Sequence, residues 1–168
     1  MRTSAVLGTL AGVWVLVACS STVPDADGAG VPAAASRTVP HTVVKSGSIA
    51  DQGQGGAARG RLVRTKASAA RALRGWDLER AIPAANRVDY ARKSLVIVLG
   101  GSVPDTAHRL AVQRVSVASR RVSVRAEIRH PAGAMGGQAI SRPYVLLAVD
   151  RDDVAGAAAT VSVRVSGP

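Results

Sequence analysis

The stretch from Leu110 to Ile128 reads LAVQRVSVASRRVSVRAEI and contains the clearest strand–turn–strand pattern of the chain. In its second half, the apolar residues of Val122–Ile128 alternate with polar ones. A two-residue period is typical of a strand with one buried face, because successive side chains of a strand point to opposite sides. Ala118–Arg120 separates the two halves as a turn. The stretch therefore predicts an antiparallel hairpin of Leu110–Val117 with Arg121–Ile128.

Three further apolar segments flank this hairpin and have the length of strands. Ser94–Leu99 is a nearly continuous apolar run that ends at Gly100-Gly101, which favours a central strand covered on both faces. Tyr144–Val149 is a second apolar run, and the alternating valines of Val161–Val165 predict a final strand. The connections are too short for crossover helices, so we expect a mainly antiparallel sheet.

One short helix is predicted before these strands. Ala67–Arg74 is rich in alanine and is followed by Gly75, a common helix terminator. The chain has no phenylalanine, so its core is expected to be aliphatic. The sequence thus predicts a mainly β fold over residues 61–168. This fold is expected to be a small antiparallel β-sandwich or barrel-like domain with one short N-terminal helix.

Residues 1–18 have the organisation of a signal peptide. Arg2 supplies a positive charge, and Ala5–Val17 is an apolar run of about 13 residues, shorter than the ~20 that a membrane-spanning helix needs. Leu16-Val17-Ala18-Cys19 then matches the lipobox of bacterial lipoproteins, and Cys19 is the only cysteine of the chain. We expect cleavage before Cys19 and a lipid on its thiol. Such a protein is anchored to the cell membrane or envelope on the extracytoplasmic side.

The segment after the lipobox has the composition of a linker. Ser20–Gly60 is rich in Gly, Ala, Ser, Thr and Pro and has no sustained apolar period. Such a segment buries too little surface to offset the conformational entropy lost on folding. Residues 19–60 are therefore expected to be the lipidated cysteine and a disordered tether, with only a weak strand signal at His41–Lys45. On this expectation the domain begins at Arg61 and folds without the tether.

The formal net charge is +11, carried mostly by arginine. Nucleic acid is not the expected partner, because an exported protein meets little of it and the basic residues are not interleaved with aromatic ones. Lipid headgroups or an anionic cell-wall polymer are candidate partners. Arg120, Arg121, Arg125 and Arg129 follow the polar face of the predicted hairpin. Solubility and protection of a sheet edge are the simpler roles for these charges.

No known catalytic or phosphate-binding motif and no metal-ligand spacing occurs in the sequence. Asp105 and His108 are close enough to touch in a loop, but a solvated polar pair is the simpler interpretation. Asp150, Asp152 and Asp153 lack the glycine and the terminal glutamate of a calcium-binding loop. The sequence thus predicts a protein that is not an enzyme and that has no cofactor and no metal site.

Several short motifs between Trp76 and Asp150 occur in a characteristic order: Val88-Asp89-Tyr90, the strand Leu95–Leu99 with Gly101 and Pro104, His130-Pro131 after the hairpin, Gln138, and Pro143-Tyr144. Together they resemble the C-terminal domain of the PrcB family of protease complex subunits. The resemblance implies an all-β, non-enzymatic lipoprotein domain that binds a protease complex and supports its assembly or stability. The family's Thr-Gly-Gly-Tyr turn falls on Asp105–His108, where none of its four residues is kept.

Two loops leave the ends of predicted strands, Pro104–Arg109 and Pro131–Gln138. Loops held by a rigid sheet are where binding residues concentrate. The first loop occupies the place of the family's turn, and the second carries an apolar side chain among glycines, which suits an adaptable contact. We predict that four residues contact a protein partner: Asp105, His108, Arg109 and Met135. The alternative is a basic surface lipoprotein that adheres to an anionic cell-wall polymer or to lipid headgroups.

The lipobox generates a first testable prediction. Replacing Cys19 by alanine should prevent lipidation and block cleavage by the lipoprotein-specific peptidase, because the thiol carries the lipid. Membrane fractionation and the apparent mass of the variant in its native host measure both effects. A Cys19→Ala variant with the cleaved size and the membrane association of the parent chain would contradict the assignment.

Overall fold

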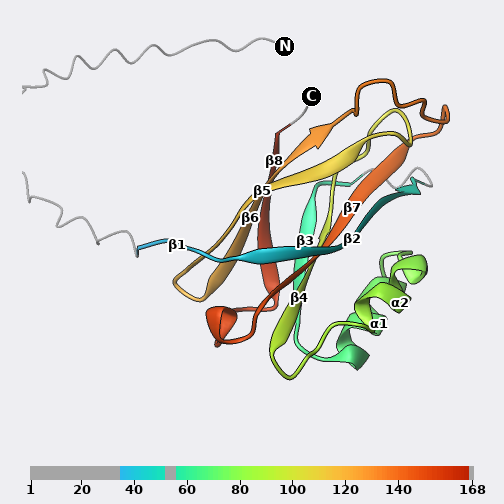
Figure 1. Cartoon of the computed structure of the whole chain (residues 1–168). Coiled ribbons are helices and arrows are strands. Elements are labelled where there is room, and N and C mark those ends of the chain that lie inside the picture. Colours follow the sequence, from blue (N-terminus) through green and yellow to red (C-terminus); the bar gives the residue numbers. More distant parts are fainter. Residues whose placement is uncertain (1–34, 52–55, 167–168) are drawn as a thin grey trace, which may run out of the picture. The chain divides into compact units, whose positions relative to one another are not determined.

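The computed structural model describes residues 35–51 and 56–166, so Cys19 and the predicted signal peptide lie outside the described residues. The fold is mainly β, as the sequence predicts (Figure 1). The elements in chain order are β1 (Arg37–Thr38), β2 (His41–Ala50), β3 (Arg59–Val63), α1 (Lys66–Arg74), a 3-10 turn (Glu79–Ala81), α2 (Ile82–Ala85), β4 (Lys93–Leu99), β5 (Arg109–Ala118), β6 (Arg121–Arg129), β7 (Ser141–Asp150), a 3-10 turn (Asp152–Val154) and β8 (Thr160–Ser166).

The described strands form one curled sheet in the order β1-β5-β6-β8-β3-β4-β7-β2. Neighbouring strands are antiparallel, except that β6 and β8 run parallel to each other. All the strands predicted from the sequence are present, including the hairpin of β5 and β6. The mainly antiparallel, barrel-like interpretation is therefore confirmed.

Strand β4 is buried on both faces, as its continuous apolar run predicts. Val96 and Val98 belong to the core inside the curled sheet, which also includes the inward residues of β5, β6 and β8. Leu95, Ile97 and Leu99 belong to a second apolar cluster, together with buried residues of α1 and α2. The helices thus cover the outer face of β4 and β7, and the two cores share these strands (Figure 1).

Helix α1 begins and ends where its sequence indicates. Thr65 is the N-cap, its hydroxyl accepts a hydrogen bond from the backbone N–H of Ser68, and Gly75 follows the last turn. Ala69, Ala72 and Leu73 form the buried stripe of the helix. The four-residue α2, with Pro83 in its first turn, was not predicted from the sequence. Among the described residues, no helix has the length and apolarity needed to cross a membrane.

The prediction that Ser20–Gly60 is a tether is wrong for its second part, because residues 37–50 and the first two residues of β3, Arg59 and Gly60, belong to the sheet. Strand β2 pairs with β7 along its whole length, from His41 opposite Val149 to Ala50 opposite Ser141. Strand β1 pairs with β5 at the other end of the strand order, and the Val39 N–H donates to the Val115 carbonyl at 2.9 Å. One chain segment therefore joins the two edges of the curled sheet (Figure 1).

The weak strand signal at His41–Lys45 is confirmed as the first half of β2. The signal is weak because the strand is held by its main chain more than by apolar burial. Most of its side chains are exposed or half-buried. Gly47 lies under the ring of Tyr144, where an added Cβ would come within 2.9 Å of the phenolic oxygen. Gly47, which resembles a linker residue in the sequence, therefore leaves room for the Tyr144 ring of the paired strand.

A β-bulge in β5 reverses which of its residues face the core. Val112 lies opposite Ala126 and Arg114 lies opposite Arg125, so Gln113 is the extra residue. Leu110 and Val115 are both buried although they are five positions apart, a spacing that strict alternation does not allow. The bulge consequently places Arg114 and Ser116 on the outer face.

The role of β1 and β2 gives a second prediction. A chain that starts at Arg61 loses β1, β2 and the first two residues of β3. It thereby loses one of the two neighbours of β7 and the buried Val39, so the core inside the sheet is uncovered. We expect this loss to exceed the margin of about 5–15 kcal/mol that keeps a domain folded. Thermal unfolding followed by circular dichroism should show no cooperative transition for this chain. A matched chain that starts at Ala34 should melt like the chain from Ser20, and a cooperative melt of the Arg61 chain would refute the role of β1 and β2.

Candidate functional site

The structure brings together the two loops that the sequence predicts to contact a partner, Pro104–Arg109 and Pro131–Gln138. Asp105 accepts hydrogen bonds at 2.8 Å from the backbone N–H of Ala107 and from Nδ1 of His108. The ring of His108 is buried and meets the ring of His130 edge to face at a centroid distance of 5.0 Å. The Nε2 atom of His130 lies 3.7 Å from the second carboxylate oxygen of Asp105. Asp105 is therefore the centre of a polar cluster that spans the start of both loops.

Backbone contacts hold the same two loops against each other. The N–H of Gly137 donates to the Thr106 hydroxyl at 2.9 Å, and the Thr106 N–H donates to the Gly137 carbonyl at 3.4 Å. A Cβ at Gly136 would come within 2.8 Å of the Asp105 carboxylate, so only glycine fits this approach. The loop Pro104–Arg109 is thus built around Asp105 and Thr106.

The four predicted contact residues have different surroundings. Asp105 and His108 hold the loops together, and Arg109 donates to the carbonyls of Thr106 at 2.6 Å and His108 at 2.9 Å. Met135 alone projects freely, with its side chain fully exposed. In the described ranges, no group of three or more His, Cys, Asp or Glu side chains is arranged to hold a metal ion.

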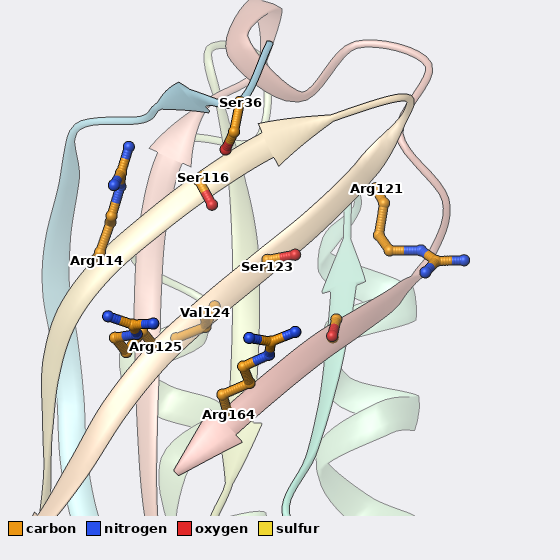
Figure 2. Close-up of a pocket in the computed structure, with 9 residues that line it drawn as sticks. Ser36, Arg114, Ser116, Arg121, Ser123, Val124, Arg125 and Arg164 are labelled. Atoms are coloured by element: carbon orange, nitrogen blue, oxygen red, sulfur yellow. The ribbon is translucent and has the colours of Figure 1, made fainter. Parts of the chain in front are cut away.

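A different surface carries a concave site on the outer face of β5, β6 and β8. Figure 2 shows the side chains around this hollow, which has a volume of about 320 Å³. We call it the arginine–serine groove, and its lining residues are Ser36, Arg114, Ser116, Arg121, Ser123, Val124, Arg125, Ser162 and Arg164. Apart from one valine, the lining consists of arginines and serines.

Strand register places these residues in two rows across the sheet. Arg125 lies directly opposite Arg114 on β5 and directly opposite Arg164 on β8. Two positions away on each strand, the residues in register are Ser116, Ser123 and Ser162. Thr38 on β1 lies opposite Ser116 and extends the hydroxyl row to a fourth strand. Neighbouring strands are about 4.8 Å apart, so each row is a short line of like side chains.

The described residues leave the positive charge of the groove without an acidic partner. None of the ion pairs formed within residues 35–51 and 56–166 includes a groove arginine. Glu127 is near in sequence, but it is engaged by Arg129 at 2.8 Å and by Gln113 at 3.2 Å. The hydrogen bond from Arg129 is the largest cause that lowers the pKa of Glu127. Like charges directly opposite each other destabilise a sheet, so the arginine row is a local cost to the fold.

Sequence reasoning found only part of this groove. Arg121 and Arg125 belong to the predicted polar face of the hairpin, whereas Arg129 pairs with Glu127 instead. Arg114 was missed because the bulge that turns it outward was not recognised. Its signal is the pair of consecutive polar residues at Gln113-Arg114 between two apolar alternations of opposite phase. Arg164 was missed because the parallel pairing of β6 with β8 joins segments far apart in the sequence.

The chemistry of the groove is that of binding. Guanidinium groups present several N–H donors in a fixed plane and are well suited to oxyanions. Serine hydroxyls add donors of moderate strength. No histidine or carboxylate lines the groove to activate a serine as a nucleophile. The lining therefore has the chemistry to bind an anion but offers no general base.

The polar cluster of the loops generates a third prediction. Burial of the carboxyl group raises the pKa of Asp105, but the Ala107 N–H and the His108 ring outweigh this effect, and its pKa lies below the ordinary value of 3.8. A lowered pKa means that ionised Asp105 stabilises the fold above pH 3.8 and that this contribution is lost as the pH falls through the folded-state pKa. Asp105→Asn should therefore lower the melting temperature at pH 7, and the difference from the parent chain should shrink progressively as the pH falls below 3.8. A difference that does not change with pH would show that the charge of Asp105 is not what holds the loops.

Comparison of the chain with protein-family models, with curated proteins and with solved structures found no match. The resemblance to the PrcB C-terminal domain therefore stays a prediction from the sequence.

Proposed function

We propose that this chain is a lipid-anchored protein of the bacterial cell envelope that binds anionic, phosphate-bearing surfaces through the arginine–serine groove. The observation that carries the proposal is the row of Arg114, Arg125 and Arg164, which lie in register on three strands without a carboxylate partner in the described structure. A row of like charges destabilises the sheet, so an external anion that neutralises it gains free energy. The proposed role is binding, without catalysis.

The position of the groove relative to the predicted anchor supports this role. Ser36 lines the groove and is only 17 residues after Cys19. A chain of that length spans at most about 60 Å when fully extended. A lipid on Cys19 therefore keeps the groove within reach of the headgroups of the same membrane and of polymers close to it. Anchoring raises the effective concentration of such ligands around the groove.

Binding to a protein partner is the second candidate function. The observation in its favour is that two large apolar side chains, Met135 and Ile140, are 100% and 56% exposed within the second loop and its end. An exposed apolar pair of this kind suits a protein contact of the type implied by the PrcB resemblance. Ionic strength separates the two candidates. Attraction between exposed charges is screened by salt, whereas an apolar contact largely persists.

The fourth prediction tests the proposed function with the chain from Ser20, which keeps every described residue and has no lipid. It should bind vesicles that contain phosphatidylglycerol and immobilised polyphosphate at about 50 mM salt, and release both at about 0.5 M salt. Each basic residue near an anionic surface contributes about 1 kcal/mol, so Arg125→Gln with Arg164→Gln should weaken binding roughly 30-fold. Cosedimentation and surface-based binding assays measure the two ligands.

Arg87→Gln is the matched control, because Arg87 is an exposed arginine outside the groove. The substitution removes one positive charge outside the groove, so it should weaken binding by much less than either groove substitution. Equal effects of Arg87→Gln and Arg125→Gln would mean that only net charge matters. Binding that persists at 0.5 M salt and depends on Met135 would instead favour the protein-binding function.

A further inference from the structure

We propose that the arginine–serine groove is a discrete site for a phosphate ester, in which one phosphate group is held between the arginine row and the serine row. This inference rests on the proposed function and deepens it, because a basic surface can attract anions without any specific site. What distinguishes a site is donors of two kinds in fixed register around one hollow. The groove has this arrangement.

The spacing of the two rows fits a tetrahedral oxyanion. The serines lie two residues away from the arginines on the same face of each strand, which is about 7 Å along the strand. Arg125 is at the centre of its row and Ser123 is at the centre of the other row. A phosphate group between them accepts hydrogen bonds from a guanidinium on one side and from hydroxyls on the other.

The number and the directions of the donors favour phosphate over a carboxylate. A carboxylate has two oxygens in one plane and is satisfied by a single arginine. The groove presents arginines from three strands and serines on the same three strands, with Arg121 two residues before Ser123 on β6. An anion with oxygens in several directions can engage donors of more than one strand at the same time.

The groove has room for an organic group beside the phosphate. A hollow of about 320 Å³ is much larger than the ~30 Å³ that one water molecule occupies in the liquid. A neighbouring hollow lined by Gln113, Val165 and Ser166 shares Arg125 and Arg164 with the groove. The space therefore continues along the strands past the arginine row. The ligand class is a phosphate ester whose organic part extends toward Ser166.

Simple solubility does not explain this arrangement. Charges that only keep a surface solvated do not need to be in register, and charges in register repel each other. Glu127 is on the same face of β6 as Arg125, yet it pairs with Arg129. The carboxylate nearest in sequence is thus held by another cation, and the arginine row stays open to a ligand.

The experiment titrates the chain from Ser20 with inorganic phosphate and with glycerol 3-phosphate by calorimetry and NMR, at an ionic strength kept constant with sodium chloride. We expect saturable binding of both ligands and tighter binding of the ester. Arg125→Lys keeps the charge but loses the planar fork of donors. It should weaken glycerol 3-phosphate binding about tenfold, the usual effect of one lost charge-assisted hydrogen bond. Ser123→Ala should weaken it less, and Arg87→Lys should have no effect.

Folding and charge are controlled in the same variants. The melting temperature of Arg125→Lys should equal that of the parent chain, because the variant conserves the charge. Competition of phosphatidylglycerol vesicles or polyphosphate with glycerol 3-phosphate identifies the source of the ester. Displacement of glycerol 3-phosphate by phosphatidylglycerol vesicles supports a lipid headgroup, and displacement by polyphosphate supports a polymer.

The two proposals fail in different ways. Phosphate binding that is not saturable, or that is equally strong in Arg125→Lys, overturns the discrete site even if vesicles and polyphosphate still bind in a salt-dependent way. Saturable binding of glycerol 3-phosphate without adhesion to either anionic surface supports the discrete site and overturns the proposed function.

Discussion

The pairing of one chain segment with both edges of the curled sheet is the constraint on which the rest of the structure depends. Strand β1 bonds to β5, β2 bonds to β7, and only Val39 and Pro40 separate the two strands. Val39 is completely buried between them. Because β5 and β7 lie far apart in the strand order, this segment fixes how tightly the sheet curls. An open sheet would leave the edges of β5 and β7 unpaired, with free backbone groups.

The same constraint positions the arginine–serine groove. Strand β5 is held between β1 and β6, so its bulge at Gln113 has a fixed place in the sheet. The bulge turns Arg114 outward, and the parallel pairing of β6 with β8 brings Arg164 beside Arg125. Ser36, at the start of the closing segment, completes the lining. The elements that close the sheet and the elements that line the groove are therefore partly the same.

The sequence predicts the parts of this molecule whose stability comes from apolar burial. Strands β4 to β8 and helix α1 follow from the spacing of valine, leucine and alanine, because these side chains must face a core. Strand β2 gives only a weak signal, at His41–Lys45, since its bonds to β7 are made by backbone groups that every residue type has. The proximity of Asp105 to His130 escapes such reasoning, because a loop has no period from which a partner can be inferred.

The sequence predicts single residues of the groove but not the groove itself. The arginines of β6 are recognisable as one polar face of a strand. Which arginines of β5 and β8 lie beside them is decided by the tertiary pairing of the strands. Two steps were missing: the bulge, which leaves a trace in the sequence at Gln113-Arg114, and the parallel contact of β6 with β8, which leaves none. Parallel strands must be joined by a long connection, and here the whole of β7 lies within that connection.

The distribution of ion pairs shows that the basic character of the chain is not uniform. Asp153 pairs with Arg37, Asp150 with Lys93, and Glu127 with Arg129. The pair of Lys93 with Asp150 joins β4 to β7, and the pair of Arg37 with Asp153 joins β1 to the 3-10 turn. The pair of Glu127 with Arg129 is on β6, beyond Arg125. The register of β5, β6 and β8 brings Arg114, Arg125 and Arg164 together with no acidic residue in the lining. Repulsion within such a row falls when an anion binds, so the fold and the ligand are linked: whatever binds the row also stabilises the sheet that presents it.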